Sequence, residues 1–435
     1  MRDALKASVA ARRDWIAQAT TRLVATPSPN PPLDTREVAA AAAEMLREVA
    51  PAAELEVIPL EYGVTNLIAV LHGRGPFGAQ GRRIVFSGHL DTYPLLEDLP
   101  WTVDPLGGER RGERIYGRGA CGMKGGIAAA IAAFGALAEA AEGWCSEVVL
   151  ALGGDEESMG TLGARWMLDN RPAVRGDAVL IPDVGSPEVV RCGEKGFLWF
   201  ELEASGKAAH GAHVHLGENA AERLMEALAA VLTLRGLPAA GPPIVAETIR
   251  AAASVSERIS GAGESDVLRS VTVNIGQIEG GTSPNLVPAS ARARGDIRLP
   301  LGVSTAEAEV FLRHALAPVQ GVALRILRRT EPSWTDPAHP ALRAVVAAAA
   351  ETRGGAVPVV NMRVGGSDAR VFRADGLPTI VYGPTPHGLG GVDEFVELDE
   401  LMVVAETYAL AAWDMLRNSW EAVEKRPAVK KVPSP

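Results

Sequence analysis

The spacing of apolar and polar residues separates an alternating first part of the chain from a different middle part. In the first part, stretches with helical spacing of apolar residues alternate with short apolar runs typical of buried strands. After the break PSPNPP, Asp34 and Glu37 predict a capping box for a helix that ends near Val49. The strand-like runs are TNLIAVL, RRIVFSG, SEVVLALGG and DAVLIPD, and helical runs near 123–141 and 160–169 separate some of them. This order predicts an α/β domain with a mainly parallel sheet.

The middle part has a different order of elements. FLWFELEASG alternates like a strand with one wet face, and ENAAERLMEALAAVLTL is an amphipathic helix. Two strands follow, and then Ser304 and Glu307 predict a capping box for a helix through Leu316. A last strand, VALRILRR, completes the order β-α-β-β-α-β of a ferredoxin-like domain.

A small domain inserted into a larger one accounts for both patterns. Chain length agrees, because 435 residues exceed one ordinary core. The predicted ranges are 1–189 and 333–424 for the α/β domain, 190–332 for the inserted domain, and 425–435 for a flexible tail.

Composition narrows the class of protein. The formal net charge is -10, which argues against a nucleic-acid partner or an anionic membrane. The apolar run Gly125–Ala138 is too short to span a bilayer, and the N-terminus lacks the apolar core of a signal peptide. The three cysteines form no C-x-x-C pair, which argues against a disulfide framework or a zinc ribbon. We therefore expect a cytoplasmic protein.

Polar residues follow several of the strand-like runs. His89 and Asp91 follow IVFSG, Asp155-Glu156-Glu157 follow VVLALGG, Asp183 follows AVLIP, and PTIVYGP leads towards His387. Parallel strands end at one edge of a sheet, so these groups converge. His, Asp and Glu suit Zn²⁺, Co²⁺ or Mn²⁺, and a Glu-Glu pair offers a ligand and a general base. Taken singly, each feature also fits a solvated turn, but together they predict a metal site.

The stretch YGRGACGMKGG contains a competing signal. Gly117, Gly119 and Gly122 spell the G-x-G-x-x-G of a dinucleotide-binding loop. Such a loop needs an acidic residue about 20 positions on, at the end of a second strand. Glu139 and Glu142 stand at that distance, but at the end of a helical run. A nucleotide cofactor is therefore not expected.

The exact strings resemble a known family. In order they are SGHLDTYP, WTVDP, YGRGACGMKGG, GGDEES, GKAAHGAHVHLGENA, GGTSPNLVPA, DIRLP, GGSDARVF and GLPTIVYGP. This series resembles the acetylornithine deacetylase, succinyl-diaminopimelate desuccinylase, aminoacylase and glutamate carboxypeptidase family of metallohydrolases, and it covers nearly the whole chain. The resemblance implies an α/β catalytic domain around a metal pair, and an inserted lid that forms a homodimer.

The resemblance also implies roles for individual residues. It implies metal ligands, an orienting aspartate, a general base, an oxyanion-stabilising histidine that reaches the partner subunit, and substrate-binding groups. The metal ligands would be His89, Glu157 and Asp183, and Asp91 would orient His89. Glu156 would be the general base, and His210 would stabilise the oxyanion. The substrate-binding residues would be Asn285, Arg298, Gly366 and Ser367. Arg298 would bind a substrate carboxylate.

Two positions depart from the family pattern. The family has a metal-bridging Asp where this chain has Gly122, and a ligating His where it has Gly390. Glycine has no side chain to ligate with. The second metal loses two of its three ligands and the first loses one, so the usual pair is not expected.

Three side chains are candidates to substitute for the missing ligands. His387 is three residues before Gly390, Cys121 neighbours Gly122, and Glu157 could turn to the first metal. His213 and His215 make the lid rich in imidazole, which fits either a polar surface or contact with an unusual substrate.

Three functions follow from these observations. The first is an amidohydrolase of an N-acyl amino acid or small peptide with a carboxylate, using Glu156 as base and at most one Zn²⁺, Co²⁺ or Mn²⁺. The second is a metal-free enzyme of the same fold that performs cyclisation, elimination or acyl transfer. The third is a non-catalytic dimeric binding protein.

Overall fold

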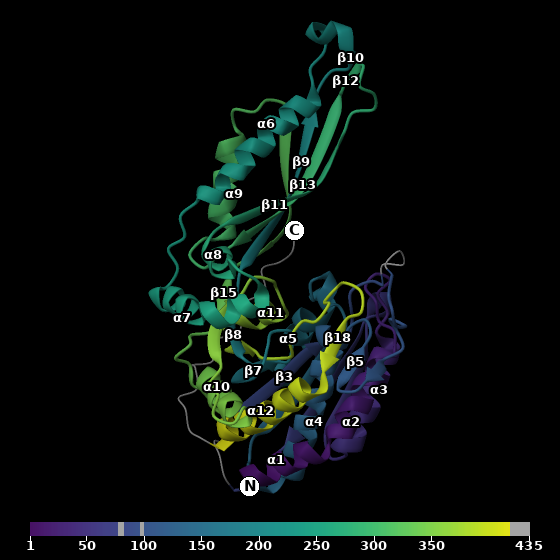
Figure 1. The fold of residues 1–435 in the computed structure, drawn as a ribbon, viewed down its shortest axis with the longest axis vertical. Coiled ribbons are helices and arrows are strands. Elements are labelled where there is room, and N and C mark those ends of the chain that lie inside the picture. The colour runs from purple at the N-terminus through teal and green to yellow at the C-terminus, as the bar shows by residue number, and fades with distance from the viewer. Residues whose placement is uncertain (77–81, 96–99, 418–435) are drawn as a thin grey trace. The chain divides into compact units, whose positions relative to one another are not determined.

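The computed structural model describes residues 1–76, 82–95 and 100–417 (Figure 1). The predicted tail, 425–435, and the predicted end of the α/β domain, 418–424, lie outside the described residues.

The chain divides into two compact units. The first unit comprises Met1–Cys192, Thr335–Val360 and the residues from Ser367 on; the second comprises Gly193–Trp334 and Asn361–Gly366.

The first unit is built on a mixed sheet with a parallel centre. The strand order is β1-β2-β6-β3-β7-β17-β8, and β16 pairs with β8. The pairs β6–β3, β3–β7 and β7–β17 are parallel, while β1, β2 and β8 join antiparallel at the two sides. These strands are β1 Glu54–Pro59, β2 Thr65–His72, β3 Arg83–His89, β6 Glu147–Gly153, β7 Ala178–Ile181, β8 Val189–Glu194, β16 Val359–Arg363 and β17 Thr379–Val381. The mainly parallel α/β sheet predicted from the sequence is confirmed.

Helices surround this sheet, and α4 is the most deeply buried. The helices of the first unit are α1 Arg2–Ala11, α2 Arg13–Val24, α3 Arg36–Val49, α4 Gly125–Glu139, α5 Trp166–Asn170, α10 Pro340–Thr352, α11 Ala369–Ala374 and α12 Leu398–Arg417. A Cβ at Gly126 would lie 1.9 Å from the carbonyl oxygen of Pro182, so only glycine lets α4 pass this close to the chain after β7. The stretch Ala120–Glu139 is long and apolar enough to cross a membrane, but its most apolar 18-residue window is wholly buried inside the protein, as in the core helix of a soluble protein.

A small antiparallel sheet of the first unit positions the loop before α12. Strand β5 (Arg114–Tyr116) lies between β4 (Glu109–Arg111) and β18 (Phe395–Glu397). Strand β18 follows Gly390 in the sequence, and β5 precedes Gly122. The pairing of β5 with β18 therefore brings the two divergent loops together.

The second unit is a four-stranded antiparallel sheet with the order β11-β13-β9-β14. Helices α6 and α9 pack on one face, where Phe200 of β9, Leu224 of α6 and Leu312 of α9 belong to one buried cluster. A short ladder, β10 with β12, lies at one end of the unit (Figure 1). The elements are β9 Gly196–Ser205, β10 Ala209–His210, α6 Ala220–Leu232, α7 Pro243–Ser260, α8 Glu264–Arg269, β11 Thr272–Gly280, β12 Leu286–Val287, β13 Ser290–Leu299, α9 Thr305–Leu316, β14 Val322–Thr330 and β15 Ser333–Trp334.

This order contains the predicted β-α-β-β-α-β pattern, with two additional helices, α7 and α8. The capping box of Ser304 and Glu307 is confirmed.

Two predictions about the chain's organisation need correction. The capping box at Asp34 and Glu37 is wrong: Thr35 is the N-cap of α3, and the Asp34 carboxylate binds Arg36 instead. Residues Asn361–Gly366, predicted as part of the α/β domain, belong to the second unit. Two hydrogen bonds hold them there, from Asn361 Nδ2 to Ser256 Oγ at 2.8 Å and from Lys195 N to the Arg363 carbonyl at 3.1 Å.

Candidate active site

His89 is the last residue of β3, in the parallel centre of the sheet. Its Nδ1 lies 2.9 Å from the Asp91 carbonyl oxygen and 3.4 Å from Asp91 Oδ1. A hydrogen bond donated by Nδ1 fixes the tautomer and leaves Nε2 to bind a cation. The predicted pairing of His89 with Asp91 is therefore present in the structure.

Asp91 also organises the turn after β6. Its Oδ1 and Oδ2 accept the backbone N–H groups of Glu156 and Glu157, each at 3.0 Å. Asn30 Nδ2 donates to Oδ2 at 2.9 Å. One buried carboxylate thus ties the end of β3 to the residues that follow β6, and sets the positions of the two glutamates.

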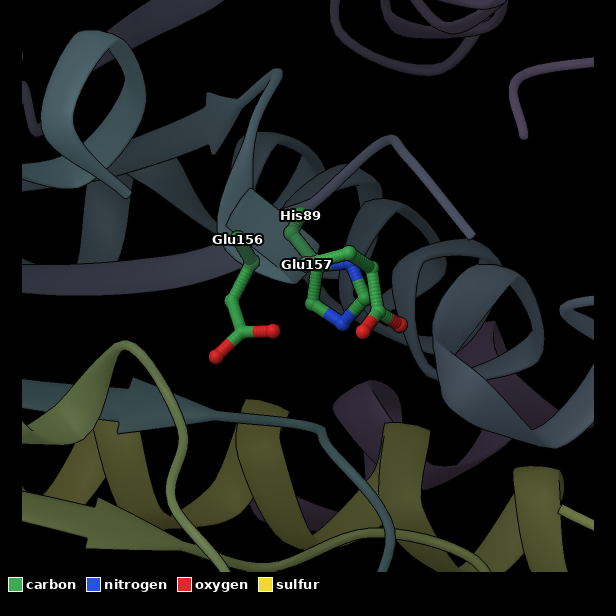
Figure 2. Close-up of side chains that lie close together, drawn as sticks. All are labelled: His89, Glu156 and Glu157. Atoms are coloured by element: carbon green, nitrogen blue, oxygen red, sulfur yellow. The ribbon is translucent and has the colours of Figure 1, made fainter. Parts of the chain in front are cut away.

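His89, Glu156 and Glu157 form the candidate centre (Figure 2). One ligand atom from each lies within 4.8 Å of the others, and no other group of three such donors occurs in the described residues. Figure 2 shows the His89 ring and the Glu157 carboxylate side by side, whereas the Glu156 side chain extends to a different side. The convergence of strand ends predicted from the sequence is thus observed at β3 and β6.

Glu157 and His89 both have raised pKa values in this centre. Burial, together with the charges of Glu156, Asp91 and Asp183, raises the pKa of Glu157 to about 8, although His89 opposes the shift. Burial lowers the pKa of His89, but the hydrogen bond to Asp91 and the surrounding carboxylates outweigh it and raise that pKa well above its usual value. A buried group of this kind retains protons that a bound cation would replace.

Glu156 has a cationic partner that the sequence analysis missed. Arg370 of α11 donates from Nη1 to Glu156 Oε1 at 2.9 Å, and both side chains are largely buried. Asp368 lies beside them; burial and the charge of Glu156 raise the pKa of this carboxyl well above its usual range. Arg370 and Asp368 both belong to the string GGSDARVF, which also contains Gly366 and Ser367. That proximity in sequence was the available signal, but nothing in the string identifies the partner.

Asp183 and His387 lie outside this three-residue centre. Asp183 is buried two residues after β7, and its Oδ1 accepts the Val184 N–H at 2.7 Å. Its charge contributes to the raised pKa of Glu157. The His387 ring stacks on Phe395, with centroids 4.4 Å apart. The ligand roles of Asp183 and His387 stay predictions.

The two divergent glycines, Gly122 and Gly390, have different surroundings. A Cβ at Gly122 would lie 2.6 Å from Leu389 Cδ1, so an apolar side chain takes the space that a side chain at 122 would need. Gly390 has φ +71°, a left-handed conformation that side-chain-bearing residues rarely adopt. A Cβ there would meet nothing closer than the Tyr93 ring at 3.9 Å.

The polar groups near these glycines are already engaged. Glu394 binds Arg118 at 2.7 Å and accepts the backbone N–H groups of Cys121 and Gly122 at 3.2 and 3.3 Å. Burial and the charge of Glu394 raise the pKa of the Cys121 thiol well above its usual value. Since metals bind the thiolate, Cys121 is a poor substitute ligand in this setting.

The second unit carries the predicted lid residues at opposite ends. His210 pairs with Leu286 in the β10–β12 ladder, and Gly211 N donates to the Asn285 carbonyl at 2.7 Å. Arg298 stands near the other end of β13, over the Phe197 ring at 5.3 Å and bound to Asp296 at 2.8 Å. At about 3.3 Å per residue, the eight steps from Ser290 to Arg298 span roughly 26 Å. One copy of this unit cannot bring His210 and Arg298 to the same small substrate.

Comparison with known proteins places this arrangement in a family. Residues 85–414 match the pattern of peptidase family M20/M25/M40. The chain belongs to this family. A succinyl-diaminopimelate desuccinylase from Rhodospirillum centenum is 32% identical over 351 residues, covering 79% of this chain and 83% of that protein. Another, from Sphingopyxis alaskensis, is 30% identical over 358 residues, with the same coverage of 79% and 83%.

Solved structures of M20 proteins share the fold. The metallo-carboxypeptidase Sso-CP2 from Sulfolobus solfataricus aligns with a TM-score of 0.75 at 17% identity, covering 92% of this chain and 98% of its own. Human carnosine dipeptidase 1 aligns with a TM-score of 0.73 at 16% identity, covering 96% and 99%. Membership in the M20 family makes this chain a hydrolase that acts on amide bonds.

The donors of this M20 chain decide which metal centre it can fit. The metal pair that the resemblance implies does not fit the described residues, because positions 122 and 390 offer no side-chain donor. A single ion does fit, because His89 and Glu157 lie together and the charge of Glu157 has no lysine or arginine partner in the described part of the chain. Imidazole with carboxylate is a donor set that suits Zn²⁺, Co²⁺ or Mn²⁺.

Proposed function

We propose that this chain removes the acyl group from an N-acyl amino acid or small peptide that carries a carboxylate, with Glu156 as general base and a single metal ion. The observation that carries the proposal is the grouping of His89, Glu156 and Glu157 within 4.8 Å at the ends of two neighbouring strands. The similarity to desuccinylases makes N-succinyl-diaminopimelate the first substrate to test.

His89 and Glu157 would hold the metal, with Asp183 beside them. When bound, the ion supplies Lewis acidity that polarises the amide carbonyl and eases deprotonation of water. Glu156 takes the proton from the attacking water and later passes it to the leaving nitrogen. Its Oε1 is bound to Arg370, so Oε2 is the oxygen that hydrogen bonds from the described residues leave open for this transfer.

The lid would supply the remaining groups from two subunits. The opposite positions of His210 and Arg298 support a homodimer in which one lid's His210 and Asn285 serve the partner's centre. Arg298 would bind the substrate carboxylate, and His210 would stabilise the oxyanion. A mixed dimer tests this arrangement: inactive Glu156→Gln and His210→Ala chains, mixed after dissociation, should regain up to about a quarter of wild-type activity. No recovery would argue against shared sites.

The function itself is tested by metal analysis together with hydrolysis. Protein purified without chelator should hold about one equivalent of metal, and should hydrolyse a member of an N-acyl amino acid panel in a chelator-sensitive manner. About two equivalents would contradict the single-ion proposal. Hydrolysis that survives complete metal removal would identify a metal-independent enzyme. Failure to hydrolyse any member of the panel, with or without added metal, would contradict the proposed substrate class.

A further inference from the structure

Arg370 distinguishes the two adjacent glutamates of the centre. It binds Glu156 Oε1 at 2.9 Å, and only 5% of the Arg370 side chain is exposed. The same Nη1 donates to the Ser367 carbonyl oxygen at 2.6 Å. The guanidinium is therefore anchored to the backbone while it holds the carboxylate.

Glu157 has no comparable partner. Within the described residues, no lysine or arginine pairs with its carboxylate; the basic group beside it is the His89 ring, which would itself bind the ion, and the other nearby charges, those of Glu156, Asp91 and Asp183, are negative. A cation entering the centre is therefore drawn to Glu157 and the His89 ring. Glu156, already neutralised, gains less from contact with it, since a charge with a partner has less to gain from a second cation.

Geometry alone would allow Glu156 to become a ligand. Its nearest carboxylate oxygen lies within 4.8 Å of the donor atoms of His89 and Glu157. A rotation about its side-chain bonds would complete a set of three ligands, the number typical of a catalytic zinc. A glutamate that ligates the metal in this way is no longer free to act as the base.

We propose that Arg370 is a positioning residue that keeps Glu156 from becoming a third metal ligand and so preserves it as the general base. The metal-binding part of this inference needs only the His89–Glu157 centre, whereas the catalytic part rests on the amidohydrolase function proposed above.

The test replaces the charge of Arg370 and follows Co²⁺ binding as well as turnover. In Arg370→Met, the affinity for Co²⁺ should rise about tenfold or more and the Co²⁺ visible spectrum should change, because a carboxylate joins the ion. Adding Glu156→Gln should abolish that gain, which a double-mutant cycle will show. On the substrate, Arg370→Met should lower kcat about 100-fold with KM within about threefold, and Arg370→Lys should recover much of the loss.

Arg373→Met is the matched control. Arg373 is a buried arginine of the same helix, and it binds the Thr379 carbonyl oxygen at 2.8 Å instead of the centre. Its loss should leave Co²⁺ affinity and spectrum unchanged. If Arg370→Met folds yet binds Co²⁺ as the wild type does, the inference is wrong. If that variant is unfolded, the same comparison with Arg370→Gln and Arg370→Lys decides. If no substrate is ever turned over, the proposed function fails while the Co²⁺ measurements still decide the role of Arg370.

Discussion

Two regions around the candidate centre differ in whether their carboxylates have an arginine or lysine partner. On the side of His89 and Glu157, a carboxylate is buried among other negative groups with its pKa raised to about 8. On the side of Gly122 and Gly390, Glu394 is fully buried, more deeply than Glu157, but Arg118 and two backbone N–H groups satisfy it. The first side needs a cation, whereas the second side is complete without one.

This difference bears on the proposal that the chain binds one ion and not two. At position 122 the end of the Leu389 side chain lies against the glycine, 2.6 Å from where a Cβ would stand, although Leu389 itself is 37% exposed. The loop before β18 is held by an internal ion pair, because Arg118 binds Glu394 and also donates to the carbonyl oxygens of Gly390 and Gly391. The carboxylate of Glu157 without an arginine or lysine partner, and the Glu394 carboxylate that already has one, support the proposal of one ion over two.

Glu156→Gln should have the largest effect and tests the chemistry of the retained side. The amide cannot take a proton, so kcat should fall about 10²- to 10⁴-fold while the fold stays intact. Steady-state kinetics on the best substrate of the panel measures this, with circular dichroism as the folding check. A loss smaller than about tenfold would mean that another group is the base.

Glu157→Gln should weaken metal binding and change the pH dependence of stability. Because the pKa of Glu157 is raised from 4.5 to about 8, the folded state binds more protons than the unfolded state at pH values between these two pKa values. The free energy of unfolding of the metal-free protein should therefore fall as pH rises from about 5 to 8.

His89, whose pKa is also raised, adds to the same trend. The variant should flatten the pH profile, as measured by thermal unfolding with chelator present. An unchanged slope in the variant would show that Glu157 is not the group that titrates.

Rebuilding the lost side should have an intermediate effect. Gly122→Asp with Gly390→His restores the two donors, and Leu389→Ala clears the contact of 2.6 Å. Metal content should rise towards about two equivalents. Stability should fall by about 1–2 kcal/mol, because histidine at 390 must adopt a φ of +71°.

Leu389→Ala alone is the control for this rebuilding and should bind no additional metal. A triple variant that folds but gains no metal would show that positions 122 and 390 do not correspond to the family's ligand positions.

His387→Ala should have the smallest effect. Its ring stacks on Phe395 and lies outside the three-residue centre, so metal affinity should change less than about twofold. Calorimetric titration with Zn²⁺ checks this, with Phe395→Leu as the control for the lost stacking. A large drop in affinity for His387→Ala alone would show that the loop moves to bring His387 onto the metal.

Several features could be predicted from the sequence because they depend on local patterns. Strand ends could be located from apolar runs, which is why the convergence of His89 with the glutamates was predicted. The capping box of Ser304 and Glu307 depends on residues three apart, and the structure contains it. Asp34 does not form the predicted capping box, because its carboxylate binds the neighbouring Arg36 side chain instead.

Other features depend on contacts between distant segments. The ion pair of Arg370 with Glu156 joins residues 214 positions apart, and that of Arg118 with Glu394 joins residues 276 apart. The place of Asn361–Gly366 in the second unit follows from such contacts as well. No periodicity or spacing could reveal them.

The sequence by itself determined that positions 122 and 390 carry no metal donor, since glycine offers no side chain to a metal wherever the fold places it. It also determined that His89 and the two glutamates each follow an apolar strand, since strand period and strand ends are local properties, whereas the parallel pairing of these strands is a contact between distant segments. Only the tertiary structure decided that Leu389 lies against position 122, that Arg118 satisfies Glu394, and that Arg370 binds Glu156 and not Glu157. These outcomes depend on which buried charges meet and which voids are filled, and packing sets both across the whole domain.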